Sequence, residues 1–184
     1  MGKRMKKYRA GVRRSSAVVI LLMLVLSVLT SCGSGGDTAR SPEAAVTAMC
    51  DALRATEEGL PRGQLYVSDA REGEAGYVTD TLLSSFLGDG REVPWQAEAA
   101  ESYAFYLSYS SPVTLAVFRC GSVGGAEELA ILLSERMRLY RTYWAGSEWE
   151  EAVLEAAVVV SGRDVFFAVA PDGKALIRRA RGRV

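Results

Sequence analysis

Apolar positions recur at helical spacing in several parts of the chain after residue 40. The clearest helix start is the Ser-Pro-Glu segment 41–43, where a preferred N-cap, a first-turn proline and an early acid precede an apolar stripe. The longest helix is expected over residues 126–143, where leucine and aromatic residues step by three and four positions. Shorter helices are expected over residues 79–87 and 148–155, and a last one begins at Pro171.

Alternating apolar and polar residues predict strands between these helices. In the segment 101–110 (ESYAFYLSYS), most aromatic residues fall on one face, whereas Tyr106 falls on the other. A second strand is expected over 114–120, and a hairpin over 158–160 and 165–169. The order α, α, β, β, α, β, β, α predicts an α+β domain, with a four-stranded antiparallel sheet and helices packed mainly on one face.

A sheet with helices mainly on one face leaves its other face to be covered, to bind something or to stand in water. That second face holds Tyr106, Leu115 and Val117, which we predict to form a contact surface. A basic segment after Asp172 offers a second contact, to anionic lipid headgroups or wall polymers. Basic residues near a helix C-terminus also simply complement the helix dipole. The basic candidates are Arg178, Arg179 and Arg181.

The N-terminal segment has the pattern of an export signal. Seven basic residues and no acidic one precede the apolar run 17–29. That run is shorter than the roughly 20 residues that a permanent membrane helix needs. It leads into Leu-Thr-Ser-Cys at residues 29–32, which resembles the bacterial lipobox. The resemblance implies cleavage between Ser31 and Cys32 and a diacylglyceryl group on the Cys32 thiol. The alternatives are an uncleaved anchor and an ordinary signal peptide with an incidental cysteine.

This interpretation divides the chain into a signal peptide (1–31), a flexible tether (32–40) and a single domain (41–184). From Cys32 onward, 22 − 7 = 15 Lys+Arg face 22 Asp+Glu, so the neutral precursor becomes a mature protein of net charge −7. A nucleic-acid partner is not expected, because phosphate binding needs a basic surface. Attachment to the membrane must then come from lipid, and a diacyl group is sufficient for stable anchoring.

Two longer segments carry a resemblance to a bacterial family. Residues 103–141 and 157–170 combine a Tyr-Ala-x-Tyr strand, an Ala-Val-Phe strand, a long helix rich in Glu and Arg, and two apolar strands around a Gly-centred turn. Together with the lipobox and the early helix, this pattern resembles the family called domain of unknown function 4358. The chain departs from it by carrying Arg where that family often carries Lys, and by its glycine-rich segment 121–125. The resemblance supports the fold and the cellular address, and implies no catalytic residues.

Histidine is absent from the sequence, which removes Ser-His-Asp and Cys-His sites and the commonest zinc and iron ligands. Glu148, Glu151 and Glu155 share one helical face and are candidates for an acid/base pair or metal ligands, although a solvated face is the favoured interpretation. The glycine-rich segment 121–125 is either a phosphate cradle or a strand-to-helix turn. It lacks the Gly-Lys-Ser/Thr of a P-loop, and two glutamates follow it.

Cys50 and Cys120 remain once Cys32 is used for the lipid. An exported compartment permits a disulfide between them, and the alternative is two small buried apolar side chains.

The sequence therefore predicts a lipid-anchored protein on the extracytoplasmic face of the cell membrane. It is expected to be non-catalytic, without metal or cofactor, and to act as a binding or accessory protein with an envelope protein partner. One alternative is a cell-wall glycan hydrolase that uses Glu148 with Glu151 or Glu155, because such enzymes need two carboxyl groups flanking a cleft. Another is a small-ligand binder with an apolar pocket between helices and sheet.

Overall fold

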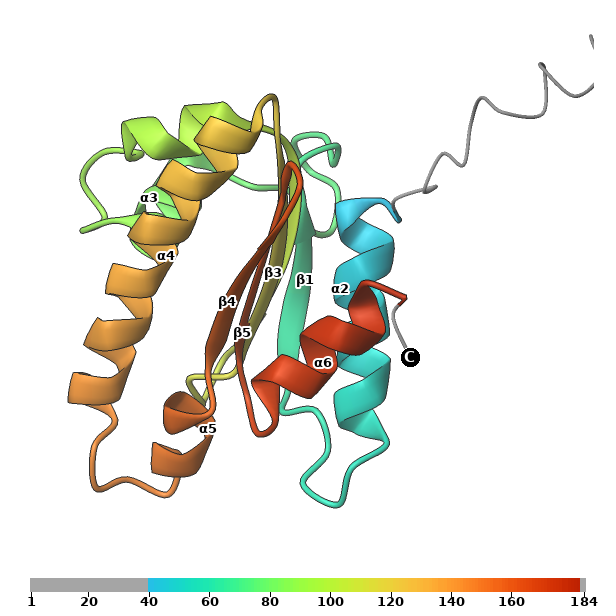
Figure 1. Ribbon diagram of the computed structural model, residues 1–184, viewed down its shortest axis with the longest axis vertical. Coiled ribbons are helices and arrows are strands. Elements are labelled where there is room, and N and C mark those ends of the chain that lie inside the picture. The colour runs from blue at the N-terminus through green and yellow to red at the C-terminus, as the bar shows by residue number, and fades with distance from the viewer. Residues whose placement is uncertain (1–39, 183–184) are drawn as a thin grey trace, which may run out of the picture. The chain divides into compact units, whose positions relative to one another are not determined.

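The sheet has a fifth strand at its edge. The computed structural model describes residues 40–182 (Figure 1), and its five strands are all antiparallel, in the spatial order β1-β2-β3-β5-β4. In chain order the elements are α2 (Pro42–Arg54), β1 (Gly63–Val67), α3 (Asp80–Leu87), the 3₁₀ helix η1 (Trp95–Ala99), β2 (Ala100–Ser108), β3 (Thr114–Cys120), α4 (Val123–Tyr143), α5 (Glu150–Leu154), β4 (Ala157–Ser161), β5 (Asp164–Val169) and α6 (Gly173–Ala180).

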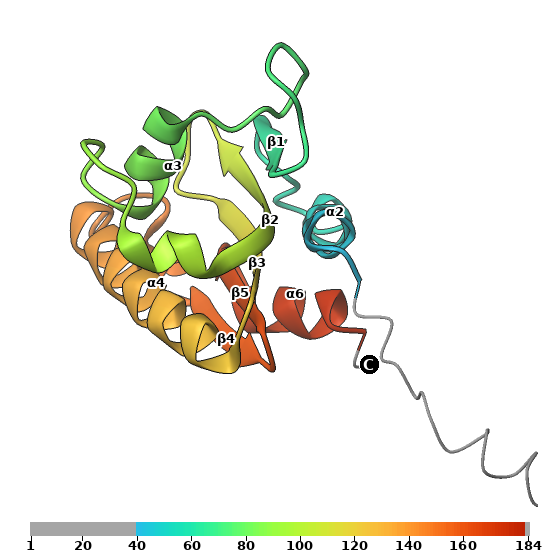
Figure 2. The same cartoon turned by 90° about the horizontal axis from the view of Figure 1, so that it is seen from above.

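Helices cover both faces of the sheet, as the two views in Figures 1 and 2 show. Helices α2 and α6 pack on one face, and α3, α4, α5 and η1 lie on the other. The α+β class and the antiparallel pairing were predicted correctly. The expectation of four strands, and of helices mainly on one face, was wrong. Strand β3 shows the reason, because apolar residues are buried on both of its faces. They are Leu115 and Val117 on one face and Ala116 and Phe118 on the other.

The missed strand β1 is short and only half-buried along its length. It pairs with β2, so that Leu65 lies opposite Tyr106. Gly63 allows the close approach, because a Cβ at this position would stand 2.2 Å from the Leu107 carbonyl oxygen and 2.6 Å from the Tyr106 ring. Five residues at a sheet edge, without an apolar alternation, are a weak sequence signal for a strand.

A serine caps α2 where the sequence predicted it, whereas α4 begins at Val123, three residues before its expected start at residue 126. The Ser41 hydroxyl accepts a hydrogen bond from the Ala44 N–H at 3.2 Å, at the start of α2. At the start of α4 the Ser122 hydroxyl accepts one from the Gly125 N–H at 3.0 Å. Glycine is needed at position 125, since a Cβ there would lie 2.8 Å from the Ala99 Cβ. The glycine-rich segment is thus a tightly packed strand-to-helix turn.

The hydrophobic core is split by the sheet into two clusters. Beneath α4, Phe86, Phe105 and Phe118 stack, with the Phe86 ring centroid 4.8 Å from that of Phe105 and 6.2 Å from that of Phe118. The opposite cluster joins α2 and α6 to the sheet. Among the described residues, the buried members of both clusters come from residues 45–180.

Candidate functional site

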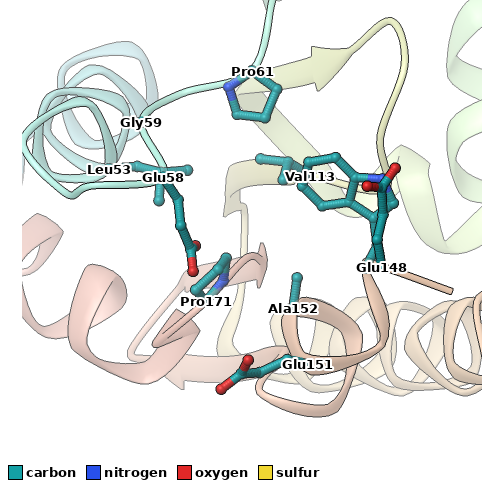
Figure 3. A pocket seen from close by; sticks show the side chains of 10 residues that line it. Leu53, Glu58, Gly59, Pro61, Val113, Glu148, Glu151, Ala152 and Pro171 are labelled. Carbon is teal, nitrogen blue, oxygen red and sulfur yellow. The ribbon is translucent and has the colours of Figure 1, made fainter. Parts of the chain in front are cut away.

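A hollow of about 310 Å³ opens at one end of the sheet, between the C-terminal end of α2 and the start of α5 (Figure 3). Its floor is apolar, since the side chains of Leu53, Val113 and Ala152 line it and are 1%, 1% and 3% exposed. Val113 immediately precedes β3 and Pro171 closely follows β5, so two central strands bring their ends to this place. The fold thus gathers residues that lie far apart in the sequence.

The half-buried indole of Trp149 forms one wall of the hollow. A turn before α5 fixes the backbone at this residue. The Ser147 hydroxyl donates to the Trp144 carbonyl at 2.7 Å and accepts from the Trp149 N–H at 3.2 Å. Gly146 adopts a φ of 72°, which favours glycine in this turn. An aromatic side chain is therefore held next to an apolar floor.

Among the described residues 40–182, three carboxylates and no lysine or arginine line the hollow. Glu58 comes from the loop after α2, whereas Glu148 and Glu151 come from the start of the α5 region. In Figure 3 the Glu58 side chain extends toward Pro171, and Glu151 lies on the α5 side. All three glutamates are exposed. An apolar pocket with one sign of charge at its mouth suits a group of opposite charge on an apolar stem.

The predicted glutamate face is divided between two places. Glu148 and Glu151 meet at the hollow, but Glu155 accepts a hydrogen bond from the Asp172 N–H and lines a different depression. The helix α5 covers only Glu150–Leu154, so Glu148 and Glu155 fall outside its regular turns. The expectation of one helical face for all three was wrong. Glu58, in turn, was missed, because no local pattern links it to residues ninety positions away.

The second depression, of about 440 Å³, lies between the C-terminal half of α4 and the start of α6. Its Arg141 side chain serves the fold. Arg141 donates from Nε to the Val153 carbonyl at 3.1 Å and from Nη2 to the Leu154 carbonyl at 3.3 Å, which closes the end of α5. The first hollow is therefore the stronger candidate for binding.

The predicted apolar contact surface is not exposed. Tyr106, Leu115 and Val117 are 5%, 0% and 1% exposed and lie in the cluster under α2 and α6. The Tyr106 hydroxyl donates to the Pro61 carbonyl, which ties β2 to the chain beside the hollow. This prediction was wrong because the sequence did not show that two helices cover this face.

The predicted basic residues remain at the surface. Arg178 and Arg179 are exposed in the last turn of α6. Arg181 is half-buried and donates to the Ser161 hydroxyl at 2.9 Å.

Cys50 and Cys120 are both free thiols, in separate clusters on opposite faces of the sheet. The possible disulfide was therefore wrong, and the alternative of two buried apolar side chains is confirmed. Burial raises the pKa of the Cys50 thiol from 9.0 to about 11 and also raises that of Cys120. Neither thiol is suited to be a nucleophile at neutral pH, which requires the thiolate.

Among residues 40–182, no three or more Cys, Asp and Glu side chains gather as ligands for a metal ion. Within the same residues, no helix has the length and apolar character to span a membrane. The proposed signal peptide, the cleavage site at Ser31 and Cys32, and nearly all of the tether lie outside the described residues.

No protein-family model, curated protein or solved structure matches this chain. The resemblance to domain of unknown function 4358 thus stays a prediction.

Proposed function

We propose that the protein is a lipid-anchored, extracytoplasmic binding protein of the cell envelope, which holds a positively charged side chain of a partner protein in the hollow between α2 and α5. The anchor is supported by the basic start, the short apolar run and the Leu-Thr-Ser-Cys segment ending at Cys32. Residues 45–180 supply two buried apolar clusters, as a tethered domain needs.

The observation that carries the binding proposal is the chemistry of the hollow. Its apolar floor and the Trp149 ring suit the aliphatic stem of a lysine or arginine, and the carboxylates of Glu58, Glu148 and Glu151 suit its charged head. A volume of about 310 Å³ accommodates a side chain or a small ligand. Within the part of the chain that the structure describes, no lysine or arginine contributes to this lining.

Binding without catalysis is supported by the side chains available. The chain has no histidine, and the thiols of Cys50 and Cys120 are buried and protonated at neutral pH. A glycosidase separates its acid from its base by their environments, typically by burying one of them. Glu148 and Glu151 are instead both exposed.

A glycan hydrolase is the second candidate, because Glu148 and Glu151 both line the hollow. Release of soluble fragments from cell-wall glycan by the purified protein would favour it, provided that Glu148→Gln and Glu151→Gln each abolish the release. The binding proposal predicts no release.

Crosslinking in intact cells tests the binding proposal. A photo-crosslinking residue in place of Arg62, an exposed neighbour of Pro61 at the hollow, is expected to capture one recurrent envelope protein. The same residue in place of Arg91, exposed in the loop after α3, serves as the control. The capture should fall when Glu148→Gln and Glu151→Gln are combined. Identical products from both positions, or capture that ignores the two glutamates, would contradict the proposal.

A further inference from the structure

Helix α6 has an apolar side and a basic side. Leu176, Ile177 and Ala180 are 5%, 1% and 2% exposed and pack on the sheet and α2. The outward residues are basic, and we call them the α6 basic face. They are the exposed Lys174, Arg178 and Arg179 and, directly after the helix, the half-buried Arg181. Positions 174, 178 and 181 are spaced by four and three residues, so they form one row along the helix.

The charges of the α6 basic face have no carboxylate partner among the described residues. Within residues 40–182, no carboxylate lies within 4.0 Å of Lys174, Arg178 or Arg179, although five such ion pairs occur elsewhere in this part of the chain. The mature protein has a net charge of −7, from 15 basic and 22 acidic residues. An anionic surface therefore repels the net negative charge of the domain but attracts the α6 basic face.

Hydrogen bonds connect this face to the point where the chain leaves toward Cys32. Arg181 donates to the Ser161 hydroxyl at 2.9 Å, and Ser161 lies opposite Asp164 in the β4–β5 hairpin. Asp164 pairs with Arg119 at 2.7 Å, and Arg119 also donates to the Arg40 carbonyl at 3.0 Å. In Figure 2 the end of α6 accordingly lies near the start of α2. The α6 basic face and the start of the domain share one side of the molecule.

The length of the linking segment keeps this side close to the lipid. From Cys32 to Arg40 there are 40 − 32 = 8 residues. A chain of that length spans at most about 29 Å when fully extended. A lipid on Cys32 would thus hold Arg40 within that distance of the headgroups, so that small rotations of the domain bring the α6 basic face within a Debye length, about 8–10 Å.

We infer that the α6 basic face docks on anionic phospholipid headgroups and orients the domain, with α2 and α6 toward the membrane. This inference rests on the lipid anchor of the proposed function. Each basic residue near an anionic membrane multiplies the docked population roughly fivefold. Stabilisation of the helix dipole, which basic residues in a last turn also provide, does not depend on the lipid. The two roles are therefore separable by changing the lipid alone.

The test uses the mature lipoprotein in vesicles that contain a nitroxide headgroup quencher. The vesicles are either phosphatidylcholine alone or a mixture with phosphatidylglycerol. Because Cys50 and Cys120 are buried, one introduced cysteine can be labelled with a fluorophore. Thr47→Cys places the label on exposed α2, and Tyr143→Cys places it at the exposed end of α4, on the other face of the sheet.

Phosphatidylglycerol is expected to increase the quenching at position 47 and not at position 143, and salt should remove the increase. Arg178→Gln with Arg179→Gln should lower the docked population roughly 25-fold. A matched control, Arg71→Gln with Arg91→Gln, removes two exposed arginines elsewhere and should keep the increase. Circular dichroism verifies that both variants are folded.

The inference would be overturned by equal quenching in the two kinds of vesicle. It would also be overturned if the control variant lost as much of the phosphatidylglycerol-dependent quenching as the Arg178→Gln, Arg179→Gln variant. Binding to soluble polyglycerol phosphate without any effect of phosphatidylglycerol would likewise overturn the inference, because such binding would assign the face to a wall polymer. Sedimentation of the same samples tests the anchor separately. A protein that fails to sediment with either vesicle would contradict the anchor and this inference together, whereas sedimentation with charge-independent quenching would contradict the inference alone.

Discussion

Arg119 and Asp164 lie directly opposite each other on β3 and β5 and form a two-pronged ion pair, with Nε–Oδ1 at 2.7 Å and Nη2–Oδ2 at 3.0 Å. Their side chains are 23% and 16% exposed. The bond to Asp164 raises the pKa of Arg119, so the guanidinium stays charged. Because Arg119 also reaches the Arg40 carbonyl, this pair fixes the start of the domain to the sheet.

The first prediction concerns this pair. Arg119→Met should lower the free energy of unfolding by about 2 kcal/mol, because it leaves the Asp164 carboxylate largely buried without its donors. Arg138→Met is the control, since Arg138 pairs with Glu135 at an exposed site and should change stability by less than about 0.5 kcal/mol. Urea unfolding measures both. Equal losses in the two variants would show that the Arg119 pair is no stronger than a surface pair.

Two adjacent glycines at the start of α4 give opposite expectations. Gly125→Ala should destabilise the protein by about 1–2 kcal/mol, because its Cβ would clash with Ala99 at 2.8 Å. Gly124→Ala should be neutral or stabilising by about 0.5 kcal/mol, since the nearest atom lies at 4.0 Å and alanine favours the helix. Thermal unfolding of the two variants distinguishes them. If Gly125→Ala left the stability unchanged, the close packing of η1 against α4 would be contradicted.

Stability at alkaline pH should depend on Cys50. Its pKa is about 11 in the folded protein and 9.0 without burial, so the unfolded chain loses the proton first. The contribution is fully present below pH 9 and is lost as the pH rises from about 9 to 11. Over that range the free energy of unfolding should fall roughly 2 kcal/mol further in the wild type than in Cys50→Ala. If the free energy of unfolding changed with pH in the same way in both proteins, a buried, protonated Cys50 thiol would be contradicted.

The hollow predicts selective binding of cationic groups. In a background of Trp95→Phe and Trp144→Phe, the fluorescence of Trp149 should respond to a lysine-rich peptide and not to a glutamate-rich peptide. Removing two rim charges, with Glu148→Gln and Glu151→Gln, should weaken the binding about tenfold.

The control for this titration removes equal charge from the exposed start of α4, with Glu127→Gln and Glu128→Gln. Its affinity should stay near that of the parent protein. A matching loss in the control would mean that net charge, and not the hollow, attracts the peptide.

Local patterns predicted most elements because apolar periodicity reports burial directly. The alternation in β2 and the apolar stripe behind the Ser41 cap are of this kind, and the structure confirms the elements they mark. The edge strand β1 was missed because it is half-buried and short. The covering of both sheet faces was also missed. An apolar stripe shows that a helix packs against the sheet, but it does not show which face of the sheet the helix covers.

The candidate site shows the same limit. Glu148 and Glu151 stood out as a local acidic pair, but Glu58 belongs with them only because the topology brings the end of α2 beside α5. Tyr106 shows the opposite error. Its position on the second face was predicted correctly, yet α2 and α6 bury it.

The lipid anchor is tested most directly by the intact mass of the N-terminal peptide of the protein purified from cell membranes. We expect a peptide that begins at Cys32 and carries a diacylglyceryl group, and a protein that loses both acyl labelling and processing on Cys32→Ala. A membrane-bound protein that retains residues before Cys32, or one whose Cys32 thiol is unmodified, would contradict it.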